Sequence, residues 1–149
     1  MKTPKTIMLI VLCSIITATS FAQTSDTKQK LYAEYPETIS LSKTIITDAF
    51  TYNTGTAVSL SLSSNFKFAG TVISNQQKYD NLQTIMIRSS DNNESIFQIS
   101  KITNKDKSIS YAGLIINNNA ADGYIIKNNN GIYSLQKFES GKILEPCKL

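Results

Sequence analysis

The chain has 149 residues, which is enough for one domain of ordinary size with a hydrophobic core. Hydrophobic residues make up 41% of it and charged residues 17%, so the composition excludes a disordered tail. The formal net charge is +4, but Arg88 is the sole arginine and no dense basic stretch occurs, which argues against nucleic-acid binding.

The first 22 residues have the three-part pattern of a secretory signal peptide. Lys2 and Lys5 form a positive start, Ile7–Ile16 is apolar, and Ser20–Ala22 places small residues at a cleavage site. The apolar run is too short to span a bilayer, so we expect no transmembrane anchor. The sequence therefore predicts a protein that begins at Gln23 after export and works in the periplasm or as a secreted protein.

The two cysteines lie in very different places. Cys13 falls within the apolar run and follows Leu12, whereas a lipoprotein signal needs a small residue there, so we expect no lipid anchor. Cleavage would leave Cys147 alone in the mature chain, as a reactive free thiol, in a disulfide-linked dimer, or buried against the sheet as a small apolar residue. No internal disulfide is then available to stabilise the fold.

Residues 23–39 are polar and read as a flexible leader that ends near Pro36, so that a single β-rich domain occupies residues 40–149. The apolar positions between Leu41 and Phe50 fall on one face of a helix. Ser40 or Ser42 can cap its start. We expect one short N-terminal helix here.

From Ala57 onward, apolar and polar residues alternate as in half-buried strands. Val58, Leu60 and Leu62 alternate with serines. Six further runs are read as strands: Phe66–Ile73, Leu82–Arg88, Ser95–Ile102, Ser108–Ile116, Tyr124–Lys127 and Ile132–Phe138.

Turn residues separate these seven runs. Asn130–Gly131 is the strongest hairpin signal, and Asn104–Lys107, Asp122–Gly123 and Asp91–Asn93 mark other turns. Links this short leave no room for crossover helices, so the strands must be antiparallel. The predicted fold is mainly β, with α+β as an alternative: an antiparallel meander forming a curved sheet, partial barrel or sandwich.

Histidine is absent, which removes imidazole bases, Ser-His-Asp catalysis and histidine zinc sites. No catalytic, cofactor-binding or metal-binding residue can therefore be assigned, and we expect a protein without cofactors that is not an enzyme. Carboxylates remain, but most fall in predicted turns or polar segments, where acids are usually solvated. Asp91–Glu94 offers oxygens for calcium but lacks the spacing of a calcium loop, which favours a plain turn.

Three tyrosines lie in neighbouring predicted strands: Tyr111, Tyr124 and Tyr133. Aromatic pairs across strands commonly stabilise a sheet, so packing is the favoured interpretation. The alternative is an aromatic surface that contacts a peptide or glycan.

Several short segments together resemble uncharacterised small secreted bacterial proteins rich in β-structure. They are Phe68–Val72, Tyr111–Gly113, Asp122–Tyr124, Ile132–Tyr133 and the terminal Cys147. The resemblance covers about Phe50 to Cys147 and implies export and a β-rich domain. It implies no catalytic residue.

The leading functional hypothesis is a non-enzymatic exported domain that binds a protein, peptide or glycan at the cell envelope. The absence of a catalytic constellation and the asparagine-rich loops favour it. One alternative is a secreted inhibitor or propeptide-like module that acts on a protease. Another is a small carboxylate-dependent hydrolase.

Overall fold

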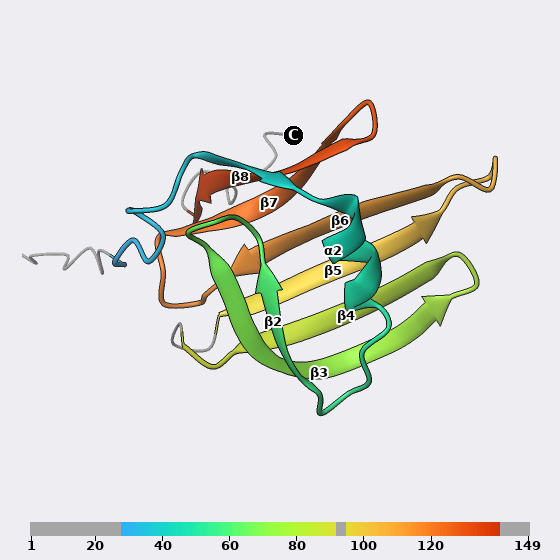
Figure 1. The fold of residues 1–149 in the computed structure, drawn as a ribbon, viewed down its shortest axis with the longest axis horizontal. Coiled ribbons are helices and arrows are strands. Elements are labelled where there is room, and N and C mark those ends of the chain that lie inside the picture. The colour runs from blue at the N-terminus through green and yellow to red at the C-terminus, as the bar shows by residue number, and fades with distance from the viewer. Residues whose placement is uncertain (1–27, 92–94, 141–149) are drawn as a thin grey trace, which may run out of the picture.

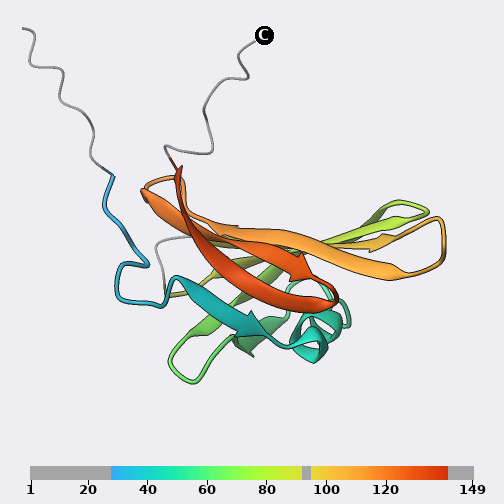
Figure 2. The same cartoon turned by 90° about the horizontal axis from the view of Figure 1, so that it is seen from above.

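One antiparallel sheet of eight strands forms the body of the protein, and it curls into a half-barrel (Figures 1 and 2). The structure is a computed structural model and describes residues 28–91 and 95–140. The predicted mainly β fold with a curved antiparallel sheet and one short helix is confirmed. The elements are β1 (Thr38–Leu41), α2 (Lys43–Ala49), β2 (Ala57–Ser61), β3 (Lys67–Tyr79), β4 (Leu82–Ser89), β5 (Ile96–Thr103), β6 (Ile109–Ile116), β7 (Asp122–Asn129) and β8 (Ile132–Glu139).

The strand order is β1-β8-β7-β6-β5-β4-β3-β2, so the two strands nearest the N-terminus occupy opposite edges of the sheet. From β2 to β8 each strand pairs with the next along the chain, which is the predicted meander. The chain passes from one edge to the other between β1 and β2. It carries α2 over the concave side of the sheet on the way (Figure 1).

Alternating side chains place the core inside the curl. In β2, Val58 and Leu60 are buried while the residues between them are exposed, as the sequence pattern predicts. Ile85 lies opposite Ile99, and Ile87 lies opposite Phe97, on the neighbouring inner strands β4 and β5. All four of these side chains are buried, so cross-strand apolar pairs hold β4 and β5 together.

The β7–β8 turn has the conformation that the sequence predicts. Asn130 and Gly131 have positive φ angles of 52° and 88°. A two-residue hairpin turn needs such angles to match the right-handed twist of the strands that it joins. The predicted turn at Asp122–Gly123 is wrong, because both residues lie in β7. The turn comes earlier, where the Ala120 N–H donates to the carbonyl oxygen of Asn117.

The predicted helix is present but shorter than expected, because it begins at Lys43 instead of Leu41. Ser42 caps it, and the Ser42 hydroxyl accepts a hydrogen bond from the Thr44 N–H at 3.3 Å. Leu41 belongs to β1 instead, where it pairs with Tyr133 of β8. The first residue of the predicted helix therefore belongs to the edge strand β1.

The predicted leader also differs from the structure, which describes its residues 28–39. This stretch is part of the domain: Tyr32 is fully buried, and the strand β1 begins at Thr38, before the expected domain start at residue 40. The segment packs because its partners come from β7 and β8, about a hundred residues further along the chain. β1 is therefore an eighth strand that the sequence pattern did not predict.

Candidate functional site

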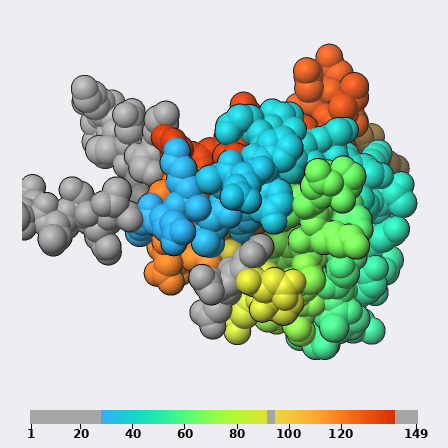
Figure 3. All heavy atoms as spheres, turned by 60° about the vertical axis from the view of Figure 1, so that its left-hand side comes forward, coloured from blue at the N-terminus to red at the C-terminus, as the bar shows by residue number. Residues whose placement is uncertain are grey.

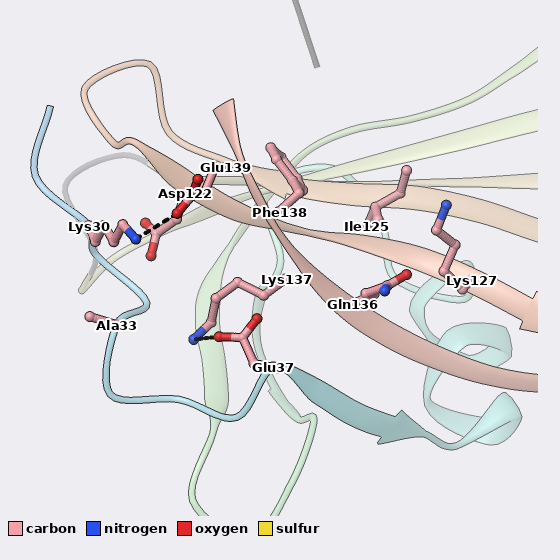
Figure 4. A pocket seen from close by; sticks show the side chains of 10 residues that line it. All are labelled: Lys30, Ala33, Glu37, Asp122, Ile125, Lys127, Gln136, Lys137, Phe138 and Glu139. Atoms are coloured by element: carbon pink, nitrogen blue, oxygen red, sulfur yellow. Dashed lines mark hydrogen bonds and ion pairs between the residues drawn. The ribbon is translucent and has the colours of Figure 1, made fainter. Parts of the chain in front are cut away.

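A groove opens where β8 extends beyond β1. β1 pairs with β8 only from Tyr133 to Gln136, whereas β8 continues to Glu139. The segment formed by residues 28–37, here called the N-terminal segment, lies beside this exposed end of β8 (Figure 3). The groove between them has a volume of about 690 Å³ (Figure 4). Its lining residues are Lys30, Ala33, Glu37, Asp122, Ile125, Lys127, Gln136, Lys137, Phe138 and Glu139.

One buried carboxylate holds the N-terminal segment in place. Asp122, at the start of β7, is only 1% exposed. Its two carboxylate oxygens accept hydrogen bonds from the N–H groups of Leu31 at 2.8 Å and Tyr32 at 3.0 Å. A buried carboxylate with two such bonds is well satisfied, so Asp122 fixes one wall of the groove.

Four aromatic rings form the support behind this wall. Tyr32 contacts Tyr124 with ring centroids 5.5 Å apart, and Tyr35 contacts Phe66 with centroids 4.5 Å apart. The hydroxyl of Tyr32 donates to the Ser95 hydroxyl at 2.9 Å. We call Tyr32, Tyr35, Phe66 and Tyr124 the aromatic cluster; it joins the N-terminal segment to the sheet.

The Tyr124 hydroxyl stays a hydrogen-bond donor at any ordinary pH. It donates to the carbonyl oxygen of Pro36 at 2.7 Å. Burial raises the pKa of Tyr124 to about 12, and the negative charges of Glu37 and Asp122 act in the same direction. The neutral phenol therefore ties the strand β7 to the chain just before β1.

Two ion pairs cross the groove from the N-terminal segment to β8. The Lys30 ammonium lies 2.7 Å from the Glu139 carboxylate, and the Lys137 ammonium lies 3.2 Å from the Glu37 carboxylate (Figure 4). The hydrogen bond and charge of Glu139 raise the pKa of Lys30 above its usual value. Lys137 also donates to the Tyr35 carbonyl at 2.6 Å. Each groove carboxylate is thus matched by a cation or by backbone N–H groups.

Other lining side chains remain available to a ligand. Lys127 and Gln136 are exposed, and within the part of the chain that the structure describes neither side chain makes a hydrogen bond or ion pair. Ile125 and Phe138 are half-buried and add apolar surface. The groove therefore offers one uncompensated cation, one amide and an apolar strip. This set suits binding contacts better than proton transfer, since the acids are already engaged.

The three tyrosines singled out from the sequence are core residues. Tyr111 is 6% exposed, Tyr124 is 0% exposed and Tyr133 is 4% exposed. The rings of Tyr111 and Tyr133 meet edge-on with centroids 5.7 Å apart, and the Tyr133 hydroxyl accepts a bond from the Tyr111 N–H. Their burial fits the packing role favoured above, and none of the three lines the groove.

Several other predicted features lie outside the described residues. These are the signal peptide, Cys13, Cys147 and most of the Asp91–Glu94 segment. Among residues 28–91 and 95–140, no group of three or more Asp, Glu, Cys or His side chains is placed to hold a metal ion. No helix in these ranges is long and apolar enough to cross a membrane.

The groove itself was not predicted, because its residues come from distant parts of the chain. The Lys30–Glu139 pair joins residues 109 positions apart, and no local pattern marks either one. The one available signal was the group of apolar residues Leu31, Tyr32 and Tyr35 within an otherwise polar stretch. Comparison with protein-family models, curated proteins and solved structures gives no match for this chain.

Proposed function

We propose that this protein is a non-enzymatic binding module that works at the cell envelope after export. Its ligand is a segment of a partner protein or a peptide, held in the groove between the N-terminal segment and β8. The signal-like sequence of the first 22 residues supports export to the periplasm or the outside. The resemblance to small secreted bacterial proteins agrees with this location.

The observation that carries the proposal is the composition of the groove. Glu37, Asp122 and Glu139 each already have a cation or N–H partner, so none is an unengaged acid or base. Lys127 and Gln136 have no such partner within the described ranges, and they flank the apolar Ile125 and Phe138. Apolar surface with a few polar groups at its side is the usual character of a binding site.

The same composition indicates the type of ligand. Lys127 adds a positive charge that the groove does not neutralise, so an acidic side chain or a terminal carboxylate fits beside it. Ile125 and Phe138 can cover a neighbouring apolar side chain. A short peptide segment with an acidic and an apolar residue meets both requirements.

Photo-cross-linking in the producing cells tests the proposal. A photoreactive amino acid replaces Ala33 or Gln136 in the groove, and matched control probes replace Ser59 of β2 or Thr71 of β3, which are exposed and lie outside the groove. We expect a discrete protein or peptide adduct from the groove probes and none from the controls. Equal adducts from all four probes, or none from the groove, would contradict the proposal.

A further inference from the structure

Three of the turns between strands lie at the same end of the sheet, which is the end where β8 begins. In an antiparallel meander the β3–β4, β5–β6 and β7–β8 turns lie at one end of the strands, and Figure 1 shows the first two projecting to the right and the β7–β8 turn projecting toward the top. We call residues 77–83, 101–111 and 126–134 the hairpin tips. They are separate from the aromatic cluster and the N-terminal segment, and they share Lys127 with the lining of the groove.

Most of the exposed large apolar side chains lie on these tips. Within the described ranges there are four such residues: Tyr79 at 71%, Ile109 at 42%, Ile116 at 36% and Ile132 at 71% exposure. Tyr79 precedes the β3–β4 turn, Ile109 follows the β5–β6 turn, and Ile132 follows the β7–β8 turn. Each hairpin thus presents one apolar residue at its tip.

The tips also hold the uncompensated positive charge. They carry five lysines against two aspartates, namely Lys78, Lys101, Lys105, Lys107 and Lys127 against Asp80 and Asp106. The other described residues carry six basic and six acidic side chains, so the formal excess of three charges lies wholly on the tips. Both ion pairs found in the described ranges lie at the groove, and neither includes a tip lysine.

We infer that the three hairpin tips bind the surface of an anionic lipid bilayer. Apolar side chains that project singly among lysines suit a membrane interface, where they enter the headgroup region while the ammonium groups meet lipid phosphates. A protein interface normally has one contiguous apolar centre, whereas here Tyr79, Ile109 and Ile132 stand on three separate turns. The positive excess of the tips complements a negative surface.

Vesicle co-sedimentation of the purified exported protein tests this inference. The vesicles contain equal parts of phosphatidylglycerol and phosphatidylcholine, with pure phosphatidylcholine as the neutral reference, in about 50 mM salt. We expect binding to the anionic vesicles and little binding to the neutral ones. Absence of binding to the anionic vesicles would overturn the inference.

Three triple variants locate the contact. The apolar variant is Tyr79→Ser, Ile109→Ser and Ile132→Ser, and the charge variant is Lys78→Gln, Lys105→Gln and Lys107→Gln. The control removes the same charge elsewhere, as Lys43→Gln, Lys67→Gln and Arg88→Gln, all at exposed positions outside the tips and the groove.

We expect the apolar and charge variants each to bind about tenfold more weakly, and the control to stay within about twofold of the wild type. Far-UV spectra and unfolding midpoints of the variants establish that each one folds. If the control lost as much binding as the charge variant, the whole net charge would be responsible and the inference would fail. It would also fail if a photoreactive residue at Ile132 formed protein adducts while the wild type ignored vesicles, since the tips would then have a protein partner.

Discussion

The groove and the hairpin tips lie on one sheet but differ in how their polar groups are used. At the groove, Lys30, Lys137 and Asp122 are engaged with other groups of the chain, and the aromatic cluster behind them is packed. At the tips, the lysines make no ion pair in the described ranges and apolar side chains such as Ile132 face solvent. The polar groups of the groove therefore help to hold the N-terminal segment on the sheet, whereas the exposed side chains of the tips, such as Ile132, contribute little to the fold.

The largest expected effect comes from removing a buried ring. Tyr32→Ala deletes a fully buried side chain at the centre of the aromatic cluster, so we expect a loss of about 4 kcal/mol in the free energy of unfolding. Tyr79→Ala is the matched control, because Tyr79 is 71% exposed, and it should change stability by no more than about 0.5 kcal/mol. Urea unfolding measures both. Similar losses for the two variants would remove the contrast between the regions.

The next effect concerns the carboxylate that anchors the N-terminal segment. Asp122→Ala leaves the N–H groups of Leu31 and Tyr32 without an acceptor, which should cost about 3 kcal/mol. The segment should then become sensitive to proteases before the sheet does. Asp106→Ala is the control, since Asp106 bonds only within its own exposed turn at Ser108. An unfolding midpoint unchanged by Asp122→Ala would contradict the anchoring role.

Sequence patterns predicted most of the strands because a strand or a tight turn is specified by residues that are close together in the chain. The alternation of Val58 and Leu60 with serines, and the Asn130–Gly131 pair, specify a strand and a turn within a few residues. β1 was missed because it is four residues long and follows Pro36 in a polar stretch. Only its pairing with β8 makes it a strand.

The candidate site was beyond prediction for the same reason. Asp122 resembled a turn residue beside Gly123, and its bonds to Leu31 and Tyr32 span about ninety residues. The three tyrosines were correctly placed on neighbouring strands, but the direction of each side chain depends on the curl of the sheet. The curl turns Tyr111, Tyr124 and Tyr133 inward.

A smaller loss of folding stability should appear at alkaline pH. An unfolded tyrosine loses its proton near its ordinary pKa of 10.0, whereas the folded Tyr124 does so at about 12. Between these values the folded state holds more protons, so stability is complete below pH 10 and falls as the pH rises toward 12. Burial raises the pKa of Tyr32 in the same direction.

Urea midpoints at pH 8, 9, 10 and 11 measure this dependence. The Tyr124→Phe variant removes this phenol and keeps every other titratable group of the protein, so the difference between the two proteins reports on Tyr124. We expect the wild type to lose more stability than the variant between pH 9 and 11. If the urea midpoints of the two proteins fell in parallel with pH, deprotonation of Tyr124 would not affect the stability of the fold.

The smallest expected effect on stability is at the tips themselves. Ile132→Ser exchanges a side chain that is 71% exposed, so we expect a change within about 0.5 kcal/mol. Leu135→Ser, on the same strand but fully buried, is the matched comparison and should cost several times more. A large loss for Ile132→Ser would mean that the tip supports the fold, and the division between the two regions would need revision.

Hydrogen–deuterium exchange of the purified protein, with and without phosphatidylglycerol vesicles, tests the central contrast most directly. If the tips meet the membrane and the groove stays open for a protein segment, vesicles should slow exchange in the hairpin tips near Tyr79, Ile109 and Ile132. Exchange in residues 28–37 and at the end of β8 should stay unchanged. Protection that appears at the groove and not at the tips would contradict the account.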